Sequence, residues 1–185
     1  MGKIILVTGG ARSGKSSFAE KLALKLGGGQ AAYIATAQIF DDEMAYRIKA
    51  HRQRRGDNWT TFEAPFAAEE MISAVAEDFS AILFDCVTIY VSNFLCASDL
   101  DDEEELYNNL RGLIQKLIDA ALSSNATIIF VSNEVGNGIV PENKLARRFR
   151  DLAGLANQML AGQADKVFLT VAGIAIDIKK LEEKL

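Results

Sequence analysis

The sequence has 185 residues, of which 49% are hydrophobic, 24% are charged and two are prolines. A chain of this length buries one sizeable core, and no linker-like stretch divides it, so we expect a single domain over residues 1–185. The formal net charge of −5 argues against a nucleic-acid-binding surface and favours small-molecule partners. Without a run long enough for a membrane span, and without the apolar region of a signal peptide, a cytoplasmic protein is expected. Cys86 and Cys96 lack metal-ligand spacing and are expected to be buried and reduced.

Apolar runs rich in Val and Ile alternate with helical patterns along the chain. This alternation is typical of parallel strands joined by crossover helices, and it predicts an α/β fold with a mostly parallel sheet flanked by helices. The predicted strands are residues 4–7, 32–35, 81–84, 127–131 and 166–171, and the pattern allows a terminal hairpin that turns around Gly173 and returns through residues 174–178.

The helical patterns lie between these strands. Glycines that can adopt the left-handed C-cap conformation end the first helix, and an acidic start suits the dipole of the second. A longer acidic run lies at the start of the third predicted helix. A solvent-exposed helix start is favoured there over a metal site. The predicted helices are residues 15–26, residues 41–55, a helix that starts within residues 99–105 and reaches about residue 122, and a helix that follows a loop at 138–141 and continues to residue 161.

The most informative segment directly follows the first predicted strand. It fits the phosphate-binding pattern G-x-x-x-x-G-K-[ST] and is called the P-loop below; its residues are Gly9, Gly10, Ala11, Arg12, Ser13, Gly14, Lys15 and Ser16. Glycines let backbone N–H groups close around phosphate oxygens, Lys15 reaches the outer phosphates, and the Ser16 hydroxyl can bind Mg²⁺. Because the strand and helix context disfavours an ordinary glycine turn, the sequence predicts a nucleotide-binding protein.

Two carboxylates, Asp85 and Glu134, follow predicted strands, and a third, Glu63, lies beyond the predicted basic helix. Asp85 closes the third predicted strand, at the sheet edge where ligands bind, and could complete a magnesium site with Ser16; a capping carboxylate is the alternative. Glu134 emerges along the same edge of the sheet. It could act as a base, as a magnesium partner or as a structural hydrogen bonder. Glu63 could accept two N–H bonds from guanine, or could be an ordinary surface residue.

His51 is the only histidine of the chain and lies in a basic segment. If the predicted helix persists, Arg47, His51 and Arg55 share one face, because they are four residues apart. Neighbouring positive charges keep the imidazole neutral and nucleophilic, and the same arginines could hold a phosphate against it. This arrangement suits a phosphohistidine-type intermediate. From the spacing alone, a solvated basic helix with an incidental histidine remains the alternative.

Several segments, taken in order, resemble one known family. They are the P-loop, residues 34–38, Asp41-Asp42-Glu43-Met44, His51-Arg52, residues 59–63, residues 85–88, residues 133–143, residues 148–151 and Ala172-Gly173-Ile174. Together they resemble the bifunctional adenosylcobinamide kinase / adenosylcobinamide-phosphate guanylyltransferase family of cobalamin biosynthesis. Two residues depart from the family pattern: Gly56 stands where many relatives have proline, and Asp85 where some have glutamate.

The resemblance implies a P-loop NTPase with a RecA-like sheet that assembles as a homotrimer. It implies phosphorylation of adenosylcobinamide by ATP or GTP, followed by transfer of GMP from GTP to adenosylcobinamide phosphate through a guanylylated histidine, here His51. The resemblance also implies which residues contact the guanine nucleotide: the P-loop, Ala35, Thr36, Ala37, Arg52, Gln53, Arg54, Arg55, Glu63 and Asp85.

We therefore expect His51 and Lys15 to be the catalytic residues, with Mg²⁺ held by Ser16 and Asp85. In this hypothesis His51 attacks the α-phosphate of GTP and expels pyrophosphate, while Lys15, Arg12 and the metal stabilise the phosphate charges. Two other interpretations remain open from the sequence. One is a simple P-loop small-molecule kinase in which His51 is structural, and the other is a GTP-dependent switch or binding module.

Overall fold

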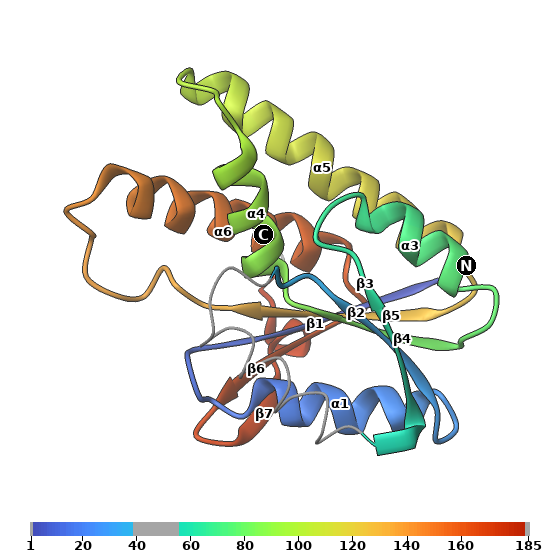
Figure 1. The fold of residues 1–185 in the computed structure, drawn as a ribbon. Coiled ribbons are helices and arrows are strands. Elements are labelled where there is room, and N and C mark those ends of the chain that lie inside the picture. Colours follow the sequence, from blue (N-terminus) through green and yellow to red (C-terminus); the bar gives the residue numbers. More distant parts are fainter. Residues whose placement is uncertain (1, 39–55, 184–185) are drawn as a thin grey trace.

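The strands of the computed structural model, which describes residues 2–38 and 56–183, form one sheet (Figure 1). Among these residues the sheet has seven strands in the order β3-β2-β4-β5-β1-β6-β7, and every neighbouring pair is parallel except β6 and β7. The strands are β1 (Lys3–Gly9), β2 (Ala31–Ala35), β3 (Trp59–Glu63), β4 (Ala81–Asp85), β5 (Thr127–Asn133), β6 (Lys166–Val171) and β7 (Ile174–Asp177).

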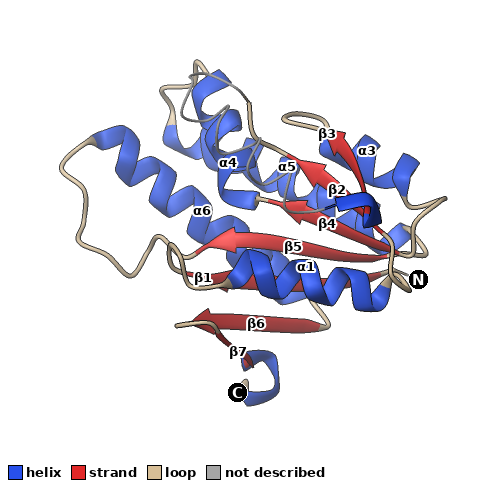
Figure 2. Ribbon diagram, turned by 60° about the horizontal axis from the view of Figure 1, so that its bottom comes forward, coloured by secondary structure: helices blue, strands red, loops and turns tan. Residues whose placement is uncertain are grey.

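Helices cover both faces of the sheet. Figures 1 and 2 show α1 on one face and the other long helices on the opposite face, which gives three layers. The α-helices among the described residues are α1 (Lys15–Leu26), α3 (Ala68–Val75), α4 (Val87–Ala97), α5 (Glu103–Ser123) and α6 (Lys144–Gln163), and short 3₁₀ helices are η1 (Gly56–Asn58) and η2 (Ile178–Leu181).

Alternation along the central strands builds two hydrophobic clusters. In β1, Ile4 and Leu6 belong to the cluster under α3, α4, α5 and α6, whereas Ile5 and Val7 belong to the smaller cluster under α1. Successive side chains of a strand point to opposite faces, so a strand that is apolar at every position is buried on both. In the larger cluster the Phe84 ring packs edge-on against Tyr90 and at a tilt against Phe130, with centroid distances of 5.5 and 5.2 Å.

The predicted mostly parallel α/β sheet is confirmed, and so are all five predicted strands and the terminal hairpin. The predicted helices at 15–26, from the acidic run to about residue 122, and through residue 161 are also confirmed within two residues. The sequence analysis did not name β3, α3 or α4. The helix expected at 41–55 lies outside the described residues.

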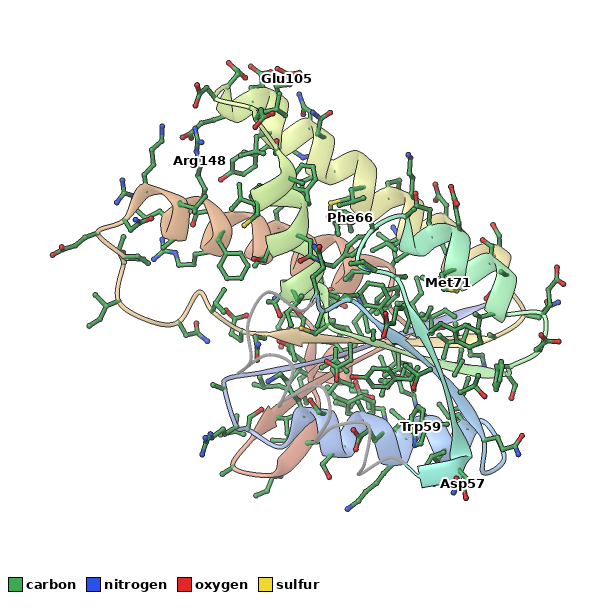
Figure 3. All side chains as sticks on the ribbon, in the orientation of Figure 1. Asp57, Trp59, Phe66, Met71, Glu105 and Arg148 are labelled. Atoms are coloured by element: carbon green, nitrogen blue, oxygen red, sulfur yellow. The ribbon has the colours of Figure 1, made fainter. Side chains whose placement is uncertain are left out.

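Side-chain caps fix the starts of α5 and α6. Asp102 Oδ1 accepts a hydrogen bond from the Glu105 amide at 2.8 Å, so the acidic run is a capped helix entry, as predicted. Arg148 of α6 donates to the Asp101 carbonyl at 2.9 Å and pairs with Glu103, and Figure 3 shows it reaching toward this end of α5. These contacts hold α5 against α6 above the sheet.

One prediction about the cysteines is wrong. Cys86 is buried at the end of β4, but Cys96 is exposed on the last turn of α4, and both are free thiols. The apolar sequence of α4 favours burial, and the helix is buried or half-buried at every position up to Leu95, but its last two residues, Cys96 and Ala97, are exposed.

Candidate functional site: a phosphate loop at the carboxyl edge of the sheet

The P-loop joins the carboxyl end of β1 to the first turn of α1. Gly9 has φ 155° and Gly14 has φ 95°, a conformation that side chains disfavour. A Cβ added at Gly9 would lie 2.7 Å from Ser13 Oγ, and one added at Gly14 would lie 3.0 Å from Gly173 Cα. Glycines are therefore required here by crowding as well as by conformation. Arg12 lies exposed at the loop tip with φ 57°.

Lys15 is buried inside this loop. Its Nζ donates a hydrogen bond to the Gly10 carbonyl at 3.2 Å, and the residue is 9% exposed. Burial lowers the pKa of the Lys15 ammonium group, and the nearby Asp85 carboxylate is among the groups that oppose this shift. A buried ammonium group inside a glycine-rich loop at the start of a helix is an arrangement that favours a phosphate anion.

Neighbouring segments hold the P-loop from both sides. The Glu134 amide donates to the Gly9 carbonyl at 3.0 Å, and the Gly173 amide donates to the Ser13 carbonyl at 2.8 Å. The sequence analysis placed Gly173 in the turn of the terminal hairpin, but it did not predict this contact with the P-loop. The Glu134 carboxylate accepts a bond from the Gly136 amide at 2.7 Å, a contact that shapes the loop after β5.

Asp85 lies at the end of β4 on the face that α1 covers. Leu83 and Ala81, two and four residues earlier on the same strand, belong to the cluster under α1, and alternation places the Asp85 side chain on the same face. Tyr33 donates to Asp85 Oδ2 at 2.9 Å. The tyrosine thus orients a carboxylate that faces the P-loop side of the sheet, a contact that the sequence analysis did not anticipate.

The segment after β2 is clamped against the end of β4. Thr36 Oγ1 donates to the Cys86 carbonyl at 2.9 Å and accepts from the Cys86 amide at 2.8 Å, while Asn93 donates to the Thr36 carbonyl at 2.8 Å. Ala35 is in register with Asp85 on one side and Glu63 on the other. These three positions therefore form one row along the carboxyl edge of the sheet.

The predicted contact residues fall into three groups. The P-loop, residues 35–37 and Asp85 lie at the carboxyl edge as expected, and exposed Glu63 lies at the far end of that edge on β3. Four strand spacings, about 19 Å, separate β3 from β1, so a nucleotide that reaches both would lie along the edge. His51, Arg52, Gln53, Arg54 and Arg55 lie outside the described residues.

The residues present fit a magnesium ion that arrives with a nucleotide. Mg²⁺ is usually bound by one or two protein oxygens together with phosphates and water, and Ser16 on α1 and Asp85 on β4 supply such oxygens. The part of the chain that the structure describes has no group of three or more His, Cys, Asp or Glu side chains arranged for a metal. A site completed by nucleotide phosphates does not need one.

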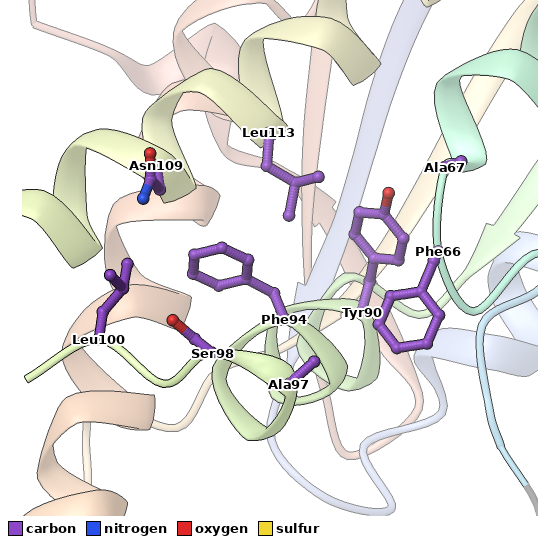
Figure 4. A pocket seen from close by; sticks show the side chains of 9 residues that line it. All are labelled: Phe66, Ala67, Tyr90, Phe94, Ala97, Ser98, Leu100, Asn109 and Leu113. Atoms are coloured by element: carbon purple, nitrogen blue, oxygen red, sulfur yellow. The ribbon is translucent and has the colours of Figure 1, made fainter.

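A separate apolar cavity lies between α4, α5 and the turn before α3. Its volume is about 310 Å³, and Figure 4 shows the rings of Phe66, Tyr90 and Phe94 along it, with Leu113 at one side. Of the predicted site residues that the structure describes, none lines this cavity, and most of its lining is apolar. It is distinct from the P-loop site.

The fold and the site together define a P-loop NTPase. The phosphate loop follows the central parallel strand β1, and the acidic residue Asp85 ends β4, which is separated from β1 by β5 alone. A family model described as "Cobinamide kinase / cobinamide phosphate guanyltransferase" matches residues 5–178. The chain belongs to this family of enzymes, which confirms the resemblance that the sequence motifs indicated.

Curated relatives match the chain over nearly its whole length. It is 48% identical over 182 residues to "Bifunctional adenosylcobalamin biosynthesis protein CobU" of Escherichia coli (strain K12), covering 95% of this chain and 99% of the relative. The protein of the same name in Salmonella typhimurium is 47% identical over 183 residues, with the same two coverages. "Bifunctional adenosylcobalamin biosynthesis protein CobP" of Pseudomonas aeruginosa is 41% identical over 174 residues, with coverages of 94% and 96%.

Among solved structures, that of the RadB recombinase matches with a TM-score of 0.48 and 15% sequence identity, covering 90% of this chain and 73% of that one. None of the helices in the described part of the chain is long and apolar enough to cross a membrane.

Proposed function

We propose that this chain phosphorylates adenosylcobinamide, with ATP or GTP as donor, and then transfers GMP from GTP to the adenosylcobinamide phosphate. The observation that carries the proposal is the P-loop with Lys15 buried inside it, in a chain that belongs to the cobinamide kinase / cobinamide phosphate guanyltransferase family. The names of the curated relatives support an enzyme of adenosylcobalamin biosynthesis with two activities.

In the kinase step the P-loop binds the donor phosphates through its backbone amides. The acceptor alcohol oxygen forms a bond to the γ-phosphorus, and the bond from that phosphorus to the β–γ bridging oxygen breaks. Lys15 and Arg12 compensate the charge on the phosphate oxygens. A bound Mg²⁺ would add charge neutralisation at the β- and γ-phosphates, with Ser16 and Asp85 as the residues that would hold it.

In the guanylyl-transfer step the nucleophile is His51. Its neutral ring nitrogen forms a bond to the α-phosphorus of GTP, and pyrophosphate leaves with the bridging oxygen. An oxygen of adenosylcobinamide phosphate then attacks the same phosphorus and releases the histidine. Support for His51 comes from its helical spacing to Arg47 and Arg55 and from the family resemblance. In the same proposal, Ala35 to Ala37, Arg52 to Arg55 and Glu63 contact the guanine nucleotide.

The test is to incubate the protein with Mg-GTP labelled at the α- or the γ-phosphate, denature it, and look for an acid-labile adduct. We expect the α-label to remain on the protein, the γ-label to leave as pyrophosphate, and the adduct to map to His51. His51→Ala should abolish the adduct and retain most of the kinase activity. Equal loss of both activities in a folded His51→Ala protein would overturn this division of labour.

The same experiment separates the other two interpretations. A protein that phosphorylates cobinamide but never carries an α-label is a simple kinase. A protein that binds GTP, forms no adduct and phosphorylates nothing is a switch or binding module. Either result would contradict the proposal above.

We further propose that the protein is a cytoplasmic homotrimer. The resemblance implies the trimer, and exposed aliphatic side chains on the edge strand β7, Ile174 at 66% and Ile176 at 52%, support self-association. Sedimentation equilibrium is expected to give three times the chain mass, and a monomer at micromolar concentration would contradict the assembly.

A further inference from the structure

Asn133 is the last residue of β5 and lies beside the P-loop. It is in register with Gly9, the first residue of that loop. Ile129 and Val131 of β5 belong to the cluster under α1, and alternation therefore places Asn133 on the same face as α1 and Asp85. Because β5 lies between β1 and β4, Asn133 stands between the P-loop and the strand that ends in Asp85.

The side-chain oxygen of Asn133 is buried and has no hydrogen-bond partner among the described residues. Other buried side-chain oxygens share this property. Ser13 Oγ lies within the P-loop, Thr8 Oγ1 belongs to the residue directly before it, and Thr170 Oγ1 belongs to β6, the strand on the other side of β1 from β5. Buried polar atoms without partners are rare in folded proteins and require an explanation. Here they flank the start of a loop that is built for phosphate.

The geometry points to Asn133 as a residue that contacts the γ-phosphate of the donor nucleotide and the acceptor alcohol. This inference rests on the kinase step proposed above. A carboxamide offers a donor and an acceptor side by side, so its Nδ2 can donate to a γ-phosphate oxygen while Oδ1 accepts the alcohol O–H. Asn133 stands between the P-loop, which would bind the phosphates, and Asp85, which together with Ser16 would hold a bound Mg²⁺, and this position suits a contact with the outermost phosphate.

Asn133 acts in this step by positioning, because an amide does not take up the proton. The alcohol oxygen bonds to the γ-phosphorus, the nucleoside diphosphate leaves with the electron pair of the broken P–O bond, and the alcohol proton passes to water. Holding the alcohol oxygen in line with the breaking bond converts a random encounter into an oriented one.

The experiment compares the binding of a non-hydrolysable ATP analogue and of ADP by titration calorimetry, with Mg²⁺ present. Asn133→Ala is expected to lower the affinity for the analogue about 10-fold and to change the affinity for ADP by no more than about twofold, because only the analogue has a γ-phosphate. The kcat of cobinamide phosphorylation should fall about 10- to 100-fold. A merely structural asparagine would change both affinities alike, and that result would overturn the inference.

Ser132→Ala is the matched control. Ser132 is the preceding residue, and its Oγ is also buried and without a partner among the described residues. It lies on the opposite face, with Phe130 and Ile128. The ratio of the two affinities should not change in this variant.

Asn133→Asp keeps the shape of the side chain and serves if Asn133→Ala does not fold. The added carboxylate would repel the γ-phosphate. The loss of affinity should therefore be at least 10-fold greater for the analogue than for ADP. Unchanged binding of the analogue by Asn133→Asp would overturn the inference. Wild-type protein that binds neither nucleotide would instead contradict the proposed function itself, so the two failures are distinguishable.

Discussion

Burial of Lys15 gives a stability prediction at the scale of one residue. Its pKa in the folded protein is lowered from 10.5, chiefly by burial, so the unfolded chain binds the proton more tightly than the folded chain does. Replacing it by methionine should therefore stabilise the ligand-free fold at pH 7. That advantage should shrink as the pH rises from the lowered pKa toward 10.5, because the wild-type ammonium group then loses its charge.

Urea unfolding of Lys15→Met at pH 7 and pH 10 measures this effect, with the exposed Lys25→Met as control. The same variant should bind GTP at least 100-fold more weakly, because the outer phosphates lose their buried counter-charge. If Lys15→Met were less stable than wild type at pH 7, the cost assigned to burying the ammonium group would be contradicted.

Tyr33 gives a second prediction at this scale. Tyr33→Phe removes the hydroxyl that donates to Asp85 but keeps the ring that packs against Trp59, with centroids 6.0 Å apart. The fold should persist, and the Mg²⁺ concentration for half-maximal kinase activity should rise about tenfold, because residues that orient a metal ligand tune its affinity. Tyr107→Phe on α5 is the control. An unchanged Mg²⁺ requirement in Tyr33→Phe would contradict a role of Tyr33 in orienting the proposed metal ligand Asp85.

Local motifs and long-range neighbours differed in how well they could be predicted. The P-loop and Asp85 were predicted because each depends on a short pattern next to an apolar run. The contacts of Tyr33 and Gly173 and the position of Asn133 depend on which strands are adjacent in the sheet. No local sequence pattern specifies that order. No structural contact of His51 is described, so its role stays a prediction.

At the scale of elements, the start of α5 can be weakened selectively. Asp102→Ala removes the cap on the Glu105 amide, which should cost about 1 kcal/mol of unfolding free energy and lower the Tm by about 2–4 °C. Asp101→Ala, which leaves the cap in place, should change little. Both variants should keep wild-type kinase activity, because this helix start lies far from the P-loop (Figure 3). Thermal unfolding and an activity assay together check the prediction.

The edge strand β3 shows why some elements could not be predicted from the sequence. It has five residues, two of them threonines, and none of its residues is buried. Its pattern therefore lacks the apolar run that revealed β4 and β5. What defines β3 is its parallel pairing with β2 from Ala31 to Ala35, a contact between segments that are far apart along the chain. This pairing also brings Glu63 to the carboxyl edge.

At the scale of the whole molecule, nucleotide binding should raise the stability of the entire domain. The P-loop is hydrogen-bonded to the segments after β5 and β6, so unfolding of the sheet destroys the binding site. GTP at 100 times its dissociation constant should add about 2.7 kcal/mol and raise the Tm by about 5–10 °C. Thermal unfolding with and without Mg-GTP measures this shift, and Lys15→Met should show almost none.

The bond from the Gly173 amide to the Ser13 carbonyl joins the turn between the last two strands to a loop near the start of the chain. In amide hydrogen exchange, Gly173 thus becomes a reporter for a ligand that it does not itself contact. When a phosphate rigidifies the loop, this amide should exchange more slowly, while amides at the far end of α5 should not change. The C-terminal hairpin would then reveal nucleotide occupancy without a label on the nucleotide.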